Sequence, residues 1–139
     1  MKAQPVVAVL DDEPEMRKAL RRLLAPRGLR VEEYASGDEF LATLGSCPMD
    51  CILLDLQMPG LNGFEVLETL RAHQIPVPVI VITAHDELGT AERVRSLGAF
   101  AYFKKPVERD SLLLAIAEAM AGQPRESHNS RIETGIDHE

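Results

Sequence analysis

Acidic residues stand directly after two apolar segments of the chain. Asp55 follows the run Cys51–Leu54, and Asp11 and Asp12 follow Val6–Leu10. Short apolar runs of this kind predict strands that are buried on both faces of a parallel sheet. Because ligands bind at the carboxyl edge of such sheets, we expect the three carboxylates to converge there. Like charges held this close are costly unless they share a cation or retain a proton; a hard divalent ion is the simpler solution, and carboxylate oxygens suit Mg²⁺.

Two further segments add a hydroxyl group and an ammonium group at the same edge. Val79–Ile82 leads to Thr83, and Ala99–Phe103 leads to Lys104 and Lys105. A carboxylate acceptor, a metal ion, a hydroxyl and an ammonium can together hold the charged oxygens of a phosphoryl group. The residues therefore predict phosphoryl transfer to an aspartate.

Strand and helix patterns alternate along the chain. A further short strand is expected at Val31–Tyr34, so that five strands are predicted in all. Amphipathic helices are predicted between and after the strands, at Pro14–Ala25, Asp38–Leu44, Gly63–His73, Glu87–Leu97 and Glu108–Met120. The alternation predicts an α/β fold with a parallel sheet and helices on both of its faces.

Four motifs match one protein family in their order and spacing. They are Val-Leu-Asp11-Asp12-Glu-Pro, Leu-Leu-Asp55-Leu-Gln-Met-Pro-Gly, Val-Ile-Thr83-Ala and Tyr102-Phe-Lys-Lys105-Pro. With them the chain resembles, from about Val6 to Met120, the receiver domain of bacterial two-component response regulators. The resemblance implies a flavodoxin-like (βα)5 doubly wound parallel sheet with strand order 2-1-3-4-5. We expect the receiver domain to occupy residues 1–122.

The resemblance also implies a role for each residue of the site. Asp55 resembles the phosphoacceptor, and Lys105 resembles the lysine that pairs with the phosphate, whereas Lys104 does not match that position. Mg²⁺ is the implied cofactor. Its implied ligands are Asp11, Asp12, Asp55 and the backbone carbonyl of Gln57. The peptide bond between Lys105 and Pro106 is expected to be cis, which only an X-Pro bond readily adopts.

A conformational switch is implied by the same resemblance. Thr83 resembles the hydroxyl that closes on the phosphoryl group, and Tyr102 resembles the aromatic residue that turns inward when Thr83 moves. The surface formed by Glu87–Leu97, Ala99–Phe103 and Glu108–Met120 would then control a partner or homodimerisation. The wide apolar stripe of Glu108–Met120 is compatible either with a dimer face or with burial against the sheet.

The implied partner is a sensor histidine kinase or a phosphotransfer protein, and a small acyl phosphate is an alternative donor. The chain would be a signalling domain, not an enzyme in the usual sense, although it would catalyse its own phosphorylation and dephosphorylation. One alternative is a pseudo-receiver, a protein-binding module that takes no phosphate. Another is an aspartyl-phosphate phosphohydrolase, which would need a second acid two residues after Asp55, where the chain has Gln57.

Composition limits the function classes. With 139 residues, 45% of them hydrophobic and 27% charged, the chain fits one globular domain. The net charge of −7 argues against direct nucleic-acid binding by this chain, although Ala91–Phe103 is similar to receivers of the FixJ and NarL group, whose output is DNA binding. No apolar run reaches the roughly 20 residues of a membrane span, and no signal peptide is recognised, so we expect a cytoplasmic protein without membrane contact.

Several residues have plainer interpretations. Cys47 and Cys51 are expected to be unpaired thiols, and His85 a solvated loop residue. The basic residues of Pro14–Ala25 form an ordinary solvated helix face that could also help to dock the kinase; they are Arg17, Lys18, Arg21 and Arg22. The polar segment 123–139 is expected to be a disordered tail, since it offers little apolar surface to bury.

Overall fold

A single parallel sheet forms the centre of the molecule, with strand order β2-β1-β3-β4-β5. A computed structural model describes residues 4–46 and 48–122. The strands are β1 (Val6–Leu10), β2 (Arg30–Tyr34), β3 (Cys51–Leu54), β4 (Val79–Thr83) and β5 (Ala101–Lys104). The predicted fold class and strand order are therefore confirmed. The order changes direction beside β1, which places a topological switch point between the ends of β1 and β3.

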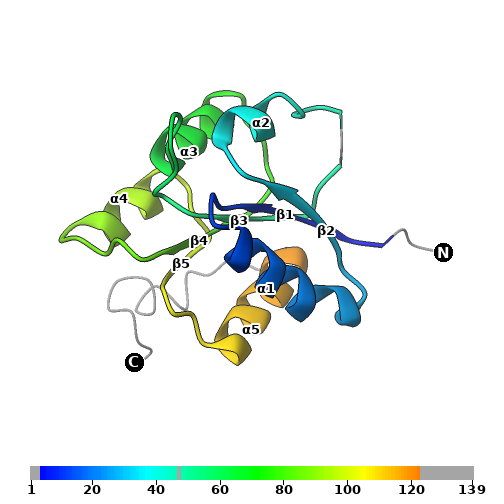
Figure 1. The fold of residues 1–139 in the computed structure, drawn as a ribbon. Coiled ribbons are helices and arrows are strands. Elements are labelled where there is room, and N and C mark those ends of the chain that lie inside the picture. The colour runs from blue at the N-terminus through cyan, green and yellow to red at the C-terminus, as the bar shows by residue number, and fades with distance from the viewer. Residues whose placement is uncertain (1–3, 47, 123–139) are drawn as a thin grey trace.

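Helices cover both faces of this sheet (Figure 1). The helices α1 (Pro14–Leu24) and α5 (Arg109–Met120) lie on one face, and a short 3₁₀ turn, η1 (Ala25–Arg27), extends α1. On the other face lie α2 (Gly37–Leu41), α3 (Gly63–Ala72) and α4 (Thr90–Ser96). No helix within residues 4–46 and 48–122 has the length and apolar character that a membrane span requires.

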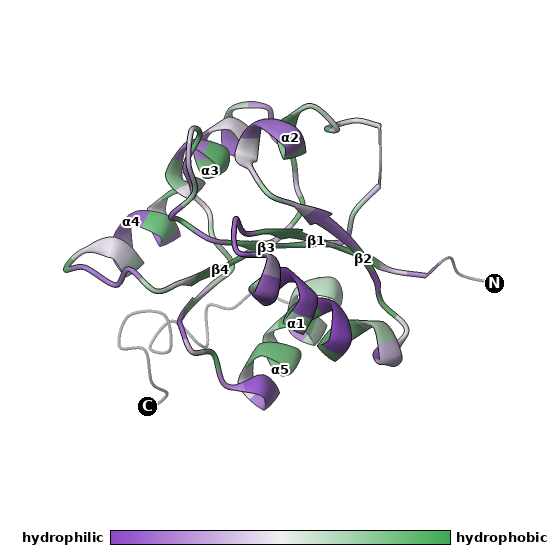
Figure 2. Cartoon of the chain, viewed as in Figure 1, coloured by the Kyte–Doolittle hydropathy of each residue, from purple (hydrophilic) through white to green (hydrophobic). Residues whose placement is uncertain are grey.

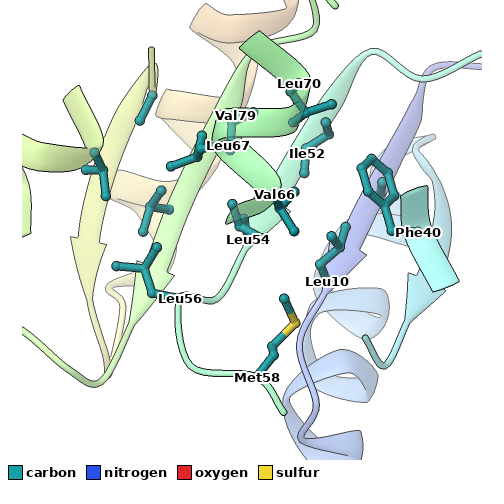
Figure 3. Packing of buried hydrophobic residues seen from close by; sticks show 14 of the residues in the cluster. Leu10, Phe40, Ile52, Leu54, Leu56, Met58, Val66, Leu67, Leu70 and Val79 are labelled. Atoms are coloured by element: carbon teal, nitrogen blue, oxygen red, sulfur yellow. The ribbon is translucent and has the colours of Figure 1, made fainter. Parts of the chain in front are cut away.

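Alternate side chains of the strands point into two separate hydrophobic cores, one on each face of the sheet. In β1, Val7 and Val9 face the core beneath α1 and α5, whereas Ala8 and Leu10 face the core beneath α2, α3 and α4. Figure 3 shows the second core, where side chains of α3 pack over β3 and Phe40 of α2 packs beside Leu10. The interior strands are accordingly hydrophobic apart from Thr83 at the end of β4, whereas the edge strand β2 is largely hydrophilic (Figure 2).

Two helices are shorter than predicted. The helix expected at Asp38–Leu44 is α2 (Gly37–Leu41), and its last predicted residues form turns before Gly45, which has a positive φ of 86°. The helix expected from Glu87 begins only at Thr90, because Gly89 adopts a left-handed φ of 89° that a helix interior does not allow. The other predicted elements differ by two residues or fewer at each end.

The apolar stripe of α5 is mostly buried against the sheet. Leu112, Ala115, Ile116 and Ala119 are buried, whereas 47% of Leu114 is exposed. Cys51 is buried, and burial raises the pKa of its thiol to about 12, so it behaves as an inert core residue. The predictions for Cys47 and for the tail 123–139 fall outside the described residues.

Gly63 allows α3 to begin directly against the end of β3. A Cβ atom at this position would lie 2.6 Å from the carbonyl oxygen of Asp55 and 2.6 Å from the Cα atom of Leu56, which no side chain can tolerate. The N–H of Gly63 donates to the carbonyl of Leu56 at 3.1 Å. The start of α3 and the segment after Asp55 are thus packed backbone against backbone.

Candidate functional site

Asp11 and Asp55 are each the first residue after a strand, yet their backbones continue the sheet pairing. The N–H of Asp55 donates to the carbonyl of Leu10 at 3.0 Å, and the N–H of Asp11 donates to that of Tyr34 at 3.1 Å. Both side chains are buried, whereas Asp12 is exposed. One carboxylate oxygen from each of the three residues lies within 4.8 Å of the others. The predicted convergence of the acidic residues is therefore present.

Lys105 reaches into this cluster from the end of β5. Its Nζ atom lies 3.0 Å from Oδ2 of Asp11 and 3.4 Å from Oδ2 of Asp55. The backbone N–H of Lys105 donates to the carbonyl of Thr83 at 2.8 Å, which fixes the start of the side chain. Lys104 is exposed, and the bond between Lys105 and Pro106 is cis, as expected. The structure thus separates the two lysines as the sequence predicted.

Charge and burial oppose one another in this cluster. Burial raises the pKa of Asp11, the backbone N–H of Glu13 and the ammonium of Lys105 lower it, and the neighbouring charge of Asp55 raises it again, so that the net shift is upward. For Lys105, burial lowers the pKa, but its contacts with Asp11, then Asp55 and Glu13, outweigh burial and raise it overall. The lysine therefore stays charged, and it compensates only part of the negative charge around it.

Carboxylate oxygens are the ligands that a hard divalent cation prefers, so the donor set fits Mg²⁺. Two of the carboxylates are also oriented by backbone donors. The N–H of Glu13 donates to Oδ1 of Asp11 at 2.9 Å, and the N–H of Gln57 donates to Oδ1 of Asp55 at 3.1 Å. The side chain of Gln57 is exposed, and the role of its backbone carbonyl as a ligand stays a prediction.

Thr83 and Tyr102 lie on the neighbouring strands β4 and β5. Thr83 is fully buried, and its Oγ1 accepts the N–H of His85 at 3.2 Å. The Tyr102 ring is buried already in this structure, and its hydroxyl donates to Oδ1 of Asp86 at 2.5 Å. Burial first, and then the bond to Asp86, raise the pKa of Tyr102, so the hydroxyl remains a donor. Rotation of the ring on activation stays a prediction.

The comparisons with known proteins agree with this geometry. The family model described as the response regulator receiver domain matches residues 7–117. The chain belongs to this family. The described fold and site are thus those of a response regulator receiver domain, a signalling domain of two-component systems.

Relatives of this receiver domain include transcriptional regulators. The transcriptional regulatory protein FixJ of Bradyrhizobium diazoefficiens is 34% identical over 114 residues, which cover 82% of the chain and 56% of FixJ. The regulator NtrC of Salmonella typhimurium is also 34% identical, over 92% of the chain but only 27% of NtrC. The chain thus spans from about a quarter to somewhat over half of these curated relatives.

Solved receiver structures share the fold. The structure named FixJ-N is 32% identical with a TM-score of 0.78, covering 87% of this chain and 96% of that one. A receiver protein from Burkholderia phymatum is 42% identical with a TM-score of 0.75, covering 84% and 95% of the two chains.

Three residues of the receiver site were missed by the sequence reasoning. Glu13 contacts Lys105 at 3.1 Å, and Asp86 accepts the Tyr102 hydroxyl. Arg17, expected on a solvated face, donates from Nη1 to the Asp11 carbonyl at 2.7 Å and from Nε to Glu33 at 3.3 Å. Lys18, Arg21 and Arg22 are exposed as expected, and so is His85.

Proposed function

We propose that this receiver accepts a phosphoryl group on Asp55. The observation that carries the proposal is the buried Asp55 carboxylate, which lies among Asp11, Asp12 and the ammonium of Lys105. A carboxylate oxygen of Asp55 would attack the phosphorus atom, and the bond between phosphorus and the donor's leaving group would break. The donor is a histidine kinase, a phosphotransfer protein or a small acyl phosphate.

The surrounding residues would bind the metal ion, hold the phosphoryl oxygens and orient the acceptor carboxylate. Mg²⁺, held by Asp11, Asp12, Asp55 and the carbonyl of Gln57, would supply positive charge that offsets the phosphoryl oxygens when it is bound. Lys105, which already contacts Asp55, is placed to donate to one of those oxygens, and Thr83 to donate its hydroxyl to another. The backbone N–H of Gln57 keeps the acceptor carboxylate oriented. The same groups would serve self-catalysed dephosphorylation by water.

Phosphorylation would change the conformation of the surface formed by α4, β5 and α5. Thr83 and Tyr102 connect the site to this surface, because β4 and β5 are paired next to each other. Phosphorylation would shift the balance between two conformations and so control a partner or homodimerisation. We place the receiver in the cytoplasm together with its phosphoryl donor. In the relatives NtrC, named as a DNA-binding transcriptional regulator, and FixJ, named as a transcriptional regulatory protein, residues beyond the matched segment make up the rest of the protein.

Intact mass spectrometry tests this proposal. The chain is incubated with acetyl phosphate with and without Mg²⁺, beside Asp55→Asn, which keeps the size of the side chain but removes the nucleophilic carboxylate. We expect one phosphate adduct on the original chain that requires Mg²⁺ and is absent from the variant. An adduct that persists in Asp55→Asn would move the acceptor elsewhere. If no adduct forms even in rapidly quenched samples, the pseudo-receiver alternative takes precedence.

A further inference from the structure

Glu13 occupies a helix-capping position without capping the helix. It is the N-cap residue of α1, and its side chain accepts no capping hydrogen bond. Instead, Oε1 of Glu13, which follows β1, lies 3.1 Å from Nζ of Lys105, which follows β5. Pro14 at the first helical position has no N–H to satisfy, which lowers the need for a cap. The carboxylate is therefore directed to the phosphoacceptor site.

Lys105 is surrounded by as many carboxylates as it has protons to donate. Its Nζ atom contacts Asp11 at 3.0 Å, Glu13 at 3.1 Å and Asp55 at 3.4 Å. An ammonium group carries three N–H donors, so these contacts use all of them. A phosphoryl oxygen could be paired by Lys105 only after one of the three carboxylates is released.

Glu13 is the partner that is easiest to release. The side chains of Asp11 and Asp55 are 5% and 6% exposed, whereas that of Glu13 is 63% exposed. Water can solvate the Glu13 carboxylate once it leaves Lys105, but it reaches the other two poorly. Asp11 is further held by the backbone N–H of Glu13 at 2.9 Å, and Asp55 by that of Gln57.

We propose that Glu13 competes with the incoming phosphoryl group for Lys105 and thereby sets how readily this receiver accepts small anionic donors. The inference rests on the proposed function, because it concerns phosphorylation of the same site. While Glu13 holds Lys105, the donor meets an additional negative charge and a lysine without a free N–H. The carboxylate must swing toward solvent before the ammonium can bind the donor's oxygens.

Initial rates of adduct formation test the competition at saturating Mg²⁺, over a range of acetyl phosphate concentrations. Glu13→Gln should lower the donor concentration at half-maximal rate by about two- to fivefold, as expected for loss of a partly exposed ion pair. Glu13→Asp should behave similarly, because its carboxylate is one methylene shorter and falls short of Lys105. Glu15→Gln, an exposed acid in the first turn of the same helix, should leave the rates unchanged.

These variants separate competition for Lys105 from a general effect of charge. The donor concentration at half-maximal rate could be unchanged in Glu13→Asp but lowered in Glu13→Gln. The negative charge near the site would then repel the donor without any contact to Lys105, and the proposed competition would be wrong. Unchanged rates in Glu13→Gln would also overturn it. Titration with Mg²⁺ alone in a calorimeter gives a second readout. Glu13→Gln should keep the Mg²⁺ affinity within about threefold, since the lost carboxylate lies outside the group of Asp11, Asp12 and Asp55 and is largely screened by solvent; a much larger loss would make Glu13 a metal ligand instead.

The two proposals fail in different ways. If neither the original chain nor any variant forms an adduct, phosphorylation of Asp55 fails, and the role of Glu13 fails with it. If the adduct forms and disappears with Asp55→Asn, but the Glu13 variants match the original chain, only the competition for Lys105 is refuted.

Discussion

At the scale of single residues, the site combines three carboxylates with one ammonium group that touches two of them. Oxygens of Asp11, Asp12 and Asp55 lie within 4.8 Å of one another, and Lys105 contacts Asp11 and Asp55. Such a concentration of like charge opposes folding when it is not balanced. A cation that binds only the folded chain would therefore stabilise it.

We expect Mg²⁺ to raise the free energy of unfolding by about 2.7 kcal/mol when its concentration is a hundred times the dissociation constant. Asp12→Asn should lose most of this gain, because it removes one negative charge and leaves only a neutral amide oxygen, which binds Mg²⁺ more weakly than a carboxylate. Urea unfolding with and without Mg²⁺ measures the difference. Glu68→Gln, an exposed acid on α3, serves as the control and should keep the full gain. An equal gain in Asp12→Asn would exclude Asp12 as a ligand.

At the scale of elements, ion pairs of Arg17 and Arg21 with Glu33 join α1 to the edge strand β2. We call this group the charged bridge, and it also contacts the backbone of Asp11. Glu33 of β2 contacts Arg17 at 3.3 Å and Arg21 at 2.5 Å. Arg17 also donates to the carbonyl of Asp11, whereas Arg21 donates to that of Val31. The bridge thus fixes the backbone of Asp11 as well as the packing of the helix.

The bridge should contribute stability in a pH-dependent way. The hydrogen bond from Arg21 outweighs burial and lowers the pKa of Glu33 below its ordinary value of 4.5. Because the folded carboxyl has the lower pKa, its contribution is complete above the ordinary value and is lost as the pH falls through the folded one. We expect Glu33→Gln to cost about 0.5–1 kcal/mol at neutral pH, since the pair is partly screened by solvent.

Urea unfolding of the original chain and Glu33→Gln near neutral pH and near pH 3 checks this expectation. The two chains should differ at neutral pH, and the difference should shrink as the pH falls and the Glu33 carboxylate takes up a proton. Glu32→Gln is the matched control, because Glu32 lies on the same strand and, within residues 4–46 and 48–122, forms a local ion pair with Arg30. A difference that persists in acid would show that lost packing, not the ion pairs, causes the effect.

Elements were predictable from the sequence wherever a local pattern decides the structure. The apolar runs before Asp11, Asp55 and Thr83 determine the strand ends, and thereby the convergence at one edge. The start of α4 was not predictable, because Glu87 and Leu88 are compatible with a helix and only the left-handed φ of Gly89 excludes them. The strand order came from the family resemblance, since alternation alone allows several orders.

The contacts that the sequence did not reveal all join residues from different elements. Arg17 and Glu33 meet only because β2 pairs beside β1 and α1 packs over both. Glu13 approaches Lys105 across 92 residues of sequence. Side-chain direction at such positions depends on packing and register, which composition and periodicity do not encode.

At the scale of the whole molecule, the site and the surface of α4, β5 and α5 are connected through paired strands. Tyr102 lies opposite Val81, and Lys104 lies opposite Thr83, so both residues proposed for the switch belong to one ladder. The loop after β4 adds Asp86, which accepts the Tyr102 hydroxyl. The inward ring is therefore held by the same loop that carries the N–H bonded to Thr83.

This connection predicts that Asp86 affects binding at Asp55, although it belongs to no ligand set. If the inward ring accompanies the phosphorylated conformation, Asp86→Ala should weaken binding of beryllofluoride with Mg²⁺, a phosphoryl mimic, by about two- to tenfold. This range corresponds to the net value of one hydrogen bond, about 0.5–1.5 kcal/mol. Asp86→Asn should bind more nearly as the original chain does, because its amide oxygen still accepts the hydroxyl.

Linkage gives the same prediction a second, independent measurement. If the ligand binds more tightly when the Tyr102 ring is buried, bound ligand must shift the equilibrium between the buried and exposed positions of the ring toward the buried one by the same factor. Beryllofluoride should therefore reduce the exposure of the Tyr102 ring in the original chain and reduce it further in Asp86→Ala, as followed by solvent perturbation of tyrosine absorbance. Tyr34→Phe leaves Tyr102 as the only tyrosine and isolates its signal. Equal or tighter binding by Asp86→Ala would mean that the inward ring and the phosphorylated site are not coupled.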